Sequence, residues 1–328
     1  MHGLRKIIFV ISFAICLMSA GYIIAYTIDD YKSQKLTGNL ADMHQSLVAE
    51  TETAEPETAE SIQTTVQDTE ESIIQTTVES VEENVEKSSS GITHSDIIVS
   101  GPEELTILDS IAPFYNINND TAGWLTINGT KIDNVVVQTM DNYFYLDHDF
   151  NKVTSQPGTL FADYRCCINN FADWQSNVLT IYGHNQKTGS MLGTLDNYKN
   201  DIDFYRQYPT FTFSNLYENY VYKIVGMFVC KTAGTPGVLE SELFLYHDFI
   251  DFNDTGYFTF QNWVDNIERR SQVNTGVDML ADDKYIVLST CSYEFINARF
   301  VVIGRRVRIG ESPEVDTSQA ALNDNPLI

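Results

Sequence analysis

Short runs of β-branched and aromatic residues, separated by turn-forming residues, fill most of the chain after residue 120. Seven of these runs are predicted to be β-strands: Trp124 to Ile127, Asn134 to Gln138, Thr159 to Phe161, Val178 to Tyr182, Tyr220 to Val229, Tyr285 to Thr290 and Phe300 to Val307. Many short strands with turns between them are typical of a β-barrel or a β-sandwich. The part of the chain after residue 101, roughly 220 residues, is long enough for one domain with a sizeable core.

Two helices are predicted around these strands. Apolar residues with helical spacing occur at Phe260, Trp263, Val264 and Ile267. The segment from Tyr257 to Arg270 should therefore form an amphipathic helix that interrupts the last strands. A second helix is predicted to begin at Pro102, where Glu103 and Glu104 occupy the first turn. Its apolar face would consist of Leu105, Leu108, Ile111 and Ala112.

The longest apolar run lies near the N-terminus. Ile7 to Tyr26 contains no charged residue, and at about 1.5 Å per residue it spans the roughly 30 Å hydrocarbon core of a bilayer. Arg5 and Lys6 precede the run and no basic residue follows closely, which places the N-terminus in the cytoplasm and the rest of the chain outside. A cleaved signal peptide is the alternative. We favour an uncleaved anchor, because the run is long for a signal peptide and no small-x-small site separates it from Asp29.

Acidic residues dominate the segment that follows. Residues 50–86 contain many acidic residues, Thr and Ser, and no basic residue, and the pentapeptide IQTTV occurs twice, at 62–66 and 74–78. Such a segment buries too little apolar surface to offset the entropy of ordering, so we predict a solvated spacer. The formal net charge of the chain is -25, and without a basic cluster this balance argues against nucleic acid as a partner.

The patterns divide the chain into five parts. These are a cytoplasmic N-terminus (residues 1–6), a transmembrane anchor (7–26), an acidic Thr/Glu-rich stalk (27–101), a folded domain (102–310) and a C-terminal tail (311–328).

A cysteine ends one predicted strand and an arginine begins the next. If Ser292 to Ala298 close an antiparallel hairpin, Cys291 and Arg299 lie opposite each other with Cβ atoms about 5 Å apart. A neighbouring cation lowers the pKa of a thiol and stabilises the reactive thiolate. The alternative for Arg299 is an ion pair with a carboxylate, a role that would suit the later strand arginines Arg305 and Arg306, or Arg308, better.

Three ordered blocks of the sequence resemble the sortase family. Leu288-Ser289-Thr290-Cys291 followed by Arg299 is similar to the sortase TLxTC-to-Arg signature. Residues 180–185 with 189–193 resemble the sortase histidine loop, and residues 123–146 resemble the start of the same domain. Together the blocks span residues 105–310, which makes the match far more specific than one motif. One departure is Asn134-Val135, where the family usually has Tyr-Pro. The long helix before the cysteine strand is similar to class B sortases and unlike class A.

The resemblance implies both a fold and an activity. The fold is mostly β, an eight-stranded sortase-type β-barrel with an N-terminal helix and a helical insertion before the cysteine strand. The activity is that of a membrane-anchored cysteine transpeptidase without cofactor or metal. It would cleave a C-terminal sorting motif of surface proteins after threonine through a thioester, and join the protein to an amine of the peptidoglycan stem peptide or its lipid-linked precursor. The enzyme would lie in the cell membrane of a Gram-positive type envelope, with its catalytic domain extracellular.

The resemblance also assigns the site. Cys291 would be the nucleophile, His184 the cation and proton donor, and Arg299 the ligand of the oxyanion. The histidines His148 and His247 lack the motif, and each is expected to be a surface or hydrogen-bonded residue instead of a catalyst. Five residues are candidates for substrate binding: Thr290, Tyr293 and Glu294 beside the nucleophile, and Ser190 and Asn142 in the matched blocks, where solvent-facing loop roles are equally open.

The other cysteines are expected to be mostly reduced thiols. Disulfides are the alternative in an oxidising exterior, but adjacent Cys166 and Cys167 are poorly placed to bridge each other. Cys230 is expected to be a small apolar residue on a strand, and Cys16 a passive residue of the anchor. Two rival functions remain: a stalked surface-binding module without turnover, and a hydrolytic cysteine peptidase in which water resolves the acyl-enzyme.

Overall fold

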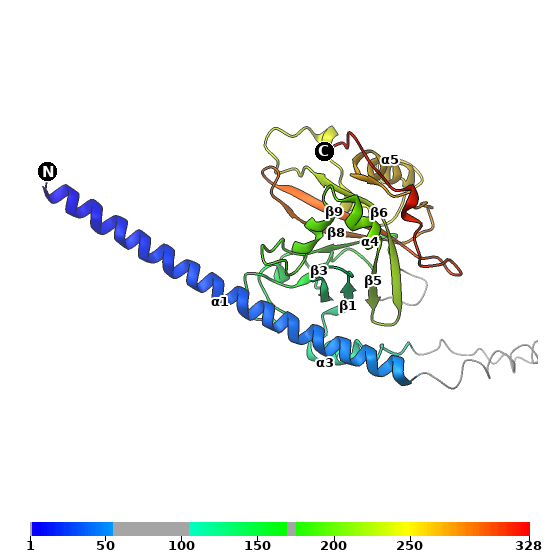
Figure 1. The fold of residues 1–328 in the computed structure, drawn as a ribbon, viewed down its shortest axis with the longest axis horizontal. Coiled ribbons are helices and arrows are strands. Elements are labelled where there is room, and N and C mark those ends of the chain that lie inside the picture. The colour runs from blue at the N-terminus through cyan, green and yellow to red at the C-terminus, as the bar shows by residue number, and fades with distance from the viewer. Residues whose placement is uncertain (1, 55–104, 169–174) are drawn as a thin grey trace, which may run out of the picture. The chain divides into compact units, whose positions relative to one another are not determined.

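Eight strands close into a barrel in the computed structural model, which describes residues 2–54, 105–168 and 175–328 (Figure 1). They are β1 (Thr121–Thr126), β2 (Asp133–Val137), β3 (Leu160–Ala162), β4 (Val178–Tyr182), β5 (Thr210–Asn215), β6 (Asn219–Cys230), β8 (Tyr285–Ser292) and β9 (Ala298–Arg306). Around the barrel they follow the order β1-β2-β3-β4-β8-β9-β6-β5, and β5 pairs with β1 to close it. The predicted eight-stranded barrel is therefore confirmed.

The barrel strand β5 has no counterpart among the predicted strands. It is only partly apolar: Phe211 and Phe213 are buried inside the barrel, whereas Thr212 between them is exposed. The departure at Asn134-Val135 leaves the strand intact, because both residues belong to β2 and pair with β1. Outside the barrel, β7 (Val273–Asn274) and β10 (Ala321–Leu322) form a small two-stranded sheet.

Four α-helices and five 3-10 segments accompany the described strands. The helices are α1 (His2–Ala54), α3 (Ala112–Ile117), α4 (Ile202–Gln207) and α5 (Phe260–Arg270). The 3-10 segments are η1 (Phe144–Leu146), η2 (Gly193–Tyr198), η3 (Glu240–Glu242), η4 (Tyr246–Asp248) and η5 (Thr317–Gln319).

The predicted helical insertion is confirmed, but the helix expected from Pro102 is misplaced. α5 begins after Thr259, whose side chain accepts a hydrogen bond from the backbone N–H of Asn262. Residues 105–108 are not helical; the backbone N–H of Leu108 instead donates to Leu216 O at 2.8 Å, beside the β5–β6 turn. α3 starts only at Ala112, where Pro113 fits the first helical turn. Residues 102–104 lie outside the described part of the chain.

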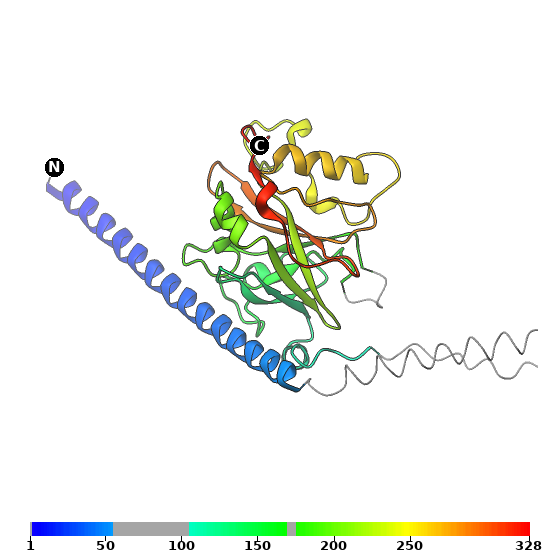
Figure 2. The same ribbon diagram turned by 45° about the vertical axis from the view of Figure 1, so that its right-hand side comes forward.

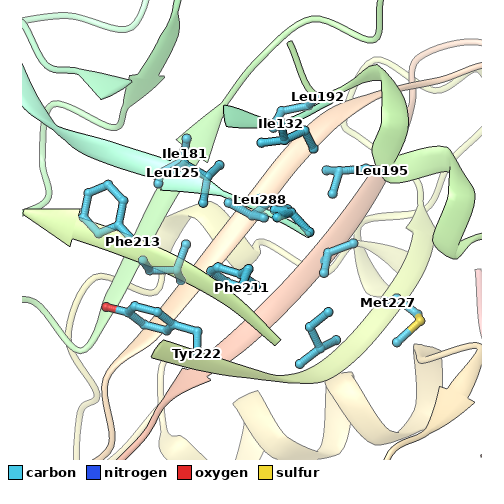
Figure 3. Close-up of a cluster of buried hydrophobic side chains, with 14 of the residues drawn as sticks. Leu125, Ile132, Ile181, Leu192, Leu195, Phe211, Phe213, Tyr222, Met227 and Leu288 are labelled. Carbon is cyan, nitrogen blue, oxygen red and sulfur yellow. The ribbon is translucent and has the colours of Figure 1, made fainter. Parts of the chain in front are cut away.

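Two apolar cores lie on opposite faces of the sheet. Side chains such as Leu125, Ile181 and Leu288 fill the barrel (Figure 3). A second cluster on the outer face packs Val287 and Val301 beneath Trp263 of α5; α5 lies outside the barrel in both ribbon views (Figures 1 and 2). Because side chains alternate along a strand, the odd-numbered residues of β8 face outward. β8 and β9 are thus buried on both sides, which explains their nearly continuous apolar sequence.

The helix α1 carries the apolar N-terminal run and continues well beyond it. Among the described helices it alone is long and apolar enough to cross a membrane. By internal contacts, residues 2–44 group with the folded domain from residue 107 onwards. The first part of the predicted stalk is therefore helical. The IQTTV repeats and most of the acidic segment lie outside the described residues.

One face of α1 packs against the barrel between Tyr26 and His44. The His44 ring stacks on Trp124 of β1, with centroids 4.0 Å apart and an interplanar angle of 11°. Burial lowers the pKa of His44 to about 4, against the opposing effect of Asp133, so the stacked ring is neutral at neutral pH. Asp29 Oδ2 accepts a hydrogen bond from the backbone N–H of Gln156 at 2.7 Å. These contacts make residues 29–44 part of the folded unit.

Two truncations separate the roles of the two parts of α1. Removal of residues 1–26 should leave a soluble folded protein with an unchanged melting temperature, because the apolar run adds nothing to the barrel core. Removal of residues 1–44 should lower the melting temperature, because it exposes Trp124 and loses a ring pair worth about 0.5–1.5 kcal/mol beyond its area. Each kcal/mol corresponds to about 2–4 °C in a domain of this size. Equal melting temperatures for the two proteins would contradict a stabilising role for residues 27–44.

Candidate active site

The hairpin of β8 and β9 brings Cys291 and Arg299 together. Their Cα atoms are register partners, as the hairpin prediction required, and the strands extend to the pair Ser292 and Ala298. On its other side, Arg299 pairs with Cys230 of β6. The three residues therefore form one row across three strands, on the outer face of the barrel.

His184 reaches the same place from the opposite side of β8. β4 pairs with β8 in parallel, and their last register pair is Tyr182 with Ser289. Two residues further along each strand, this register brings His184 level with Cys291. Cys291 thus lies between a histidine loop on one side and an arginine strand on the other.

A cavity of about 260 Å³ opens at this point. It is lined by Asn142, Leu146, Phe161, Tyr182, Gly183, His184, Ser289, Thr290, Cys291 and Arg299. The structure therefore brings together the three predicted catalytic residues and two of the predicted substrate-binding residues, Thr290 and Asn142.

The other three predicted substrate-binding residues are not among the lining residues. Tyr293 is 69% exposed and its hydroxyl donates to Asn185 O at 3.2 Å. Glu294 forms an ion pair with Lys199 at 3.0 Å. Ser190 shares a hydrogen bond with the Thr188 hydroxyl at 3.1 Å.

The imidazole of His184 is oriented by a backbone carbonyl. Its Nε2 lies 2.9 Å from Leu146 O, in η1. A carbonyl oxygen only accepts hydrogen bonds, so Nε2 carries a proton and donates it to this bond. In the neutral ring, Nδ1 is then the nitrogen that accepts a proton, and the histidine is set up for acid–base chemistry.

Arg299 keeps most of its donors available to the cavity. Its guanidinium donates a hydrogen bond to the neighbouring Ala298 O at 3.1 Å, and no carboxylate of the described residues pairs with it. Arg305 instead pairs with Glu311 at 2.6 Å, and Arg308 with Asp283 at 2.6 Å. Arg306 lies 4.4 Å from the ring of Tyr220. The guanidinium of Arg299 is therefore placed to receive an anion in the cavity.

The five cysteines, all in the described part of the chain, form no disulfide and lie in different surroundings. Burial raises the pKa of Cys166 and of Cys230 to about 12. Such thiols are poor nucleophiles near neutral pH, because the thiolate is the reactive form. Cys291 differs from both in that it is half-buried and lines the cavity.

The two histidines that were not predicted to be catalytic lie outside the cavity lining. His148 stacks on Phe144 with centroids 4.1 Å apart, and its Nδ1 lies 2.7 Å from Asp147. Burial lowers the pKa of His247, beside Asp248. No group of three or more metal-ligating side chains gathers among the residues that the structure describes.

A buried carboxylate that the sequence analysis missed supports the cavity wall. Asp163 is fully buried and its Oδ2 accepts hydrogen bonds from Arg165, Asn142 and Tyr182 at 2.8, 3.0 and 2.9 Å. Burial opposes ionisation, but the hydrogen bonds from Arg165 outweigh it and hold the pKa of Asp163 below its usual value. Two of the bonded side chains line the cavity. A sequence signal exists in the charged pair Asp163 and Arg165, directly after an apolar strand.

Comparisons with known proteins agree with this site. The chain is 32% identical over 203 residues to sortase B of Listeria monocytogenes, covering 61% of this chain and 75% of the relative. It is 28% identical over 196 residues to sortase B of Staphylococcus aureus, covering 59% and 72% of the two chains. A solved structure of a mutant form of Clostridium perfringens sortase B superposes with a TM-score of 0.51 at 28% identity, covering 61% of this chain and 87% of the other. No protein-family model matches the chain.

The relatives, the closed barrel with its helical insertion, and the cavity shared by a cysteine, a histidine and an arginine agree on one assignment. The chain belongs to the sortase B family, the class B sortases, and is a cysteine transpeptidase.

Proposed function

We propose that this transpeptidase cleaves a C-terminal sorting motif after threonine and joins the surface protein to an amine of cell-wall peptidoglycan or its lipid-linked precursor. The observation that carries the proposal is the meeting of Cys291, His184 and Arg299 in one cavity, from three neighbouring strand ends. We also propose that residues 7–26 remain in the membrane as an anchor, with the N-terminus cytoplasmic and the catalytic domain outside.

Acylation begins with attack by the Cys291 thiolate on the threonine carbonyl carbon. The carbon–oxygen double bond opens to an oxyanion as the carbon–sulfur bond forms. Arg299, which has no carboxylate partner among the described residues, donates hydrogen bonds to this oxyanion. The interaction strengthens as charge develops, so it lowers the barrier rather than merely holding the substrate.

Proton transfer by His184 completes the two half-reactions. The imidazolium gives its proton to the departing amine while the carbon–nitrogen bond breaks, and a threonyl thioester remains on Cys291. The acceptor amine then attacks the thioester carbon, loses a proton to the neutral imidazole, and releases the thiolate. Because Nε2 is committed to Leu146 O, we assign both transfers to Nδ1.

The peptide would lie along the residues beside the nucleophile. Asn142 and Thr290 contribute to the cavity lining. We propose that the Asn142 side chain contacts the sorting motif directly, whereas Thr290 is buried and its hydroxyl donates to Gly183 O at 2.8 Å. The other three candidates, Tyr293, Glu294 and Ser190, would contact the substrate from outside this lining. Of these, Tyr293 lies in the loop that follows Cys291 and is 69% exposed.

Mass spectrometry of the protein incubated with sorting peptides and candidate amines tests the function. We expect a threonyl adduct on Cys291 and, with the correct amine, an amide-linked product. Release of hydrolysed peptide alone, whatever amine is present, would favour the hydrolytic peptidase instead. The absence of any adduct would favour the binding module.

Cys291→Ala should abolish cleavage, whereas Cys166→Ala and Cys230→Ala should largely preserve it. The reason is that the two buried thiols have pKa values of about 12 and only Cys291 among these three lines the cavity. The measurement is thioester capture by intact-mass spectrometry, and Cys167→Ala is a further control. An adduct on any other cysteine would overturn the assignment.

His184→Ala should lower turnover by about 10²–10⁴-fold with little loss of folding, because it removes the proton donor of the leaving amine. His148→Ala and His247→Ala should have mild effects, since neither side chain lines the cavity. Steady-state rates and melting temperatures of the three variants check this. Equal damage from all three substitutions would point to a structural role instead.

Arg299→Lys should lower the acylation rate by about 10²–10³-fold, because an ammonium keeps the charge but loses the planar pair of donors. Single-turnover acylation is the measurement. Arg306→Lys is the matched control, because Arg306 lies on the same strand and stacks on Tyr220. Near-normal acylation by Arg299→Lys would mean that charge alone suffices, or that Arg299 only braces the hairpin.

A further inference from the structure

The backbone ladder that aligns the histidine loop with the cysteine strand stops short of the two catalytic residues. The β4–β8 register ends at Tyr182 and Ser289. Two more bonds involve the next residue, Gly183: its N–H donates to Ser289 O at 3.3 Å, and its carbonyl accepts from the Thr290 hydroxyl at 2.8 Å. Neither of these bonds holds His184 or Cys291 itself. Other contacts must therefore set the spacing between them.

Asn185, directly after the histidine, joins the loop to the cysteine. Its Nδ2 donates to the backbone carbonyl of Cys291 at 2.9 Å and to Asp196 Oδ2 at 3.1 Å. The side-chain amide thus connects the residue after His184 with the nucleophile's own peptide unit. Asp196, in η2, holds the amide in this orientation.

Lys199 binds Asp196, the residue that orients the Asn185 amide. Its ammonium forms ion pairs with Asp196 Oδ1 at 2.9 Å and with Glu294 Oε1 at 3.0 Å. It also donates a hydrogen bond to the hydroxyl of Ser292, the residue after Cys291, at 2.8 Å. Only 15% of the Lys199 side chain is exposed, so these contacts are better shielded than those of a surface ion pair.

The surroundings of Lys199 suit a fixed position. The ammonium lies 5.1 Å from the centroid of the Phe300 ring, and Phe300 is the cross-strand partner of Thr290. Without the lysine, Asp196 and Glu294 would be two carboxylates near one another with no cation between them. Their repulsion would push η2 and the loop after Cys291 apart.

We propose that Lys199 is a positioning residue for acyl transfer, which acts with Asp196 and Asn185 to hold the Cys291 strand and the His184 loop at working distance. None of the three lines the cavity, so none is assigned a contact with the reacting atoms. The proposal deepens the proposed function, because it rests on Cys291 and His184 being the reacting pair. Displacement of reacting groups by about 1 Å costs on the order of 10²-fold in rate, which sets the scale of the effect.

The test is single-turnover acylation of the full-length protein by a sorting peptide, for the parent and for Lys199→Met. We expect a loss of about 10–100-fold in the maximal acylation rate with little change in the peptide concentration at half-maximal rate. Lys199→Arg keeps the charge and several donors and should recover most of the loss. The matched control is Lys231→Met, which removes a lysine paired with Glu242 at 3.0 Å, outside the cavity lining.

Two additional measurements make the outcome decisive. Asn185→Ala alone should also slow acylation, and the double variant with Lys199→Met should lose less than the product of the two effects, because both act through the same contacts. The rate at which iodoacetamide alkylates Cys291, which needs no peptide, should fall in Lys199→Met and stay unchanged in Lys231→Met. Melting temperatures separate misfolding from displacement, and Lys199→Gln replaces Lys199→Met if the latter does not fold.

Some results would overturn the proposal. These are a folded Lys199→Met protein with parental acylation and alkylation rates, a change confined to the half-maximal concentration, or fully multiplicative losses in the double variant. If the parent forms no acyl-enzyme with any peptide, the proposed function fails. In that case the alkylation rates still decide whether Lys199 positions Cys291.

Discussion

The parallel pairing of β4 with β8 is the constraint on which the site depends. It unites segments more than a hundred residues apart in the chain and makes the end of one strand level with the end of the other. Parallel neighbours cannot be joined by a tight turn, and here the connection contains β5, β6 and α5. This long connection does not disturb the site, because the parallel pairing of β4 with β8 stays intact.

The division of the sheet into two apolar faces explains where the cavity lies. The inner-face residues pack together into one buried apolar cluster that fills the barrel. The outer face is covered by α5 and its neighbouring aromatic residues only along part of β6, β8 and β9. Beyond the end of this cover, two further outward-facing residues of β8, Ser289 and Cys291, line the cavity. The insertion thus serves both as a second core and as one boundary of the site, with the Tyr246 hydroxyl 2.8 Å from Ser289 Oγ.

Local sequence patterns predicted many of the strands and the helical insertion. They could not predict which distant segments pair with one another. β8 and β9 are apolar on both faces, so their runs are easily recognised, and the hairpin between them follows from a short loop. β5 was missed although the alternation of Thr212 with the buried Phe211 and Phe213 is itself a strand pattern, because the segment is only partly apolar. The packing face of α1 also went unpredicted, because polar residues such as Asp29, Ser33 and His44 make many of its contacts beside Leu36 and Leu40. The positions of Asn185 and Lys199 depend on how three separate loops meet. A local sequence pattern cannot predict such an arrangement.

The place of Arg299 between two thiols has a consequence for how the site responds to oxidation. Cys291, Arg299 and Cys230 occupy one row across β8, β9 and β6. Two interstrand spacings of about 4.8 Å place the backbones of the two cysteines farther apart than the roughly 7 Å that a disulfide can bridge. The arginine strand therefore keeps Cys230 from capturing an oxidised Cys291. A chain that needs one thiol free for chemistry retains a second thiol on the same face of the sheet without the risk of an internal crosslink.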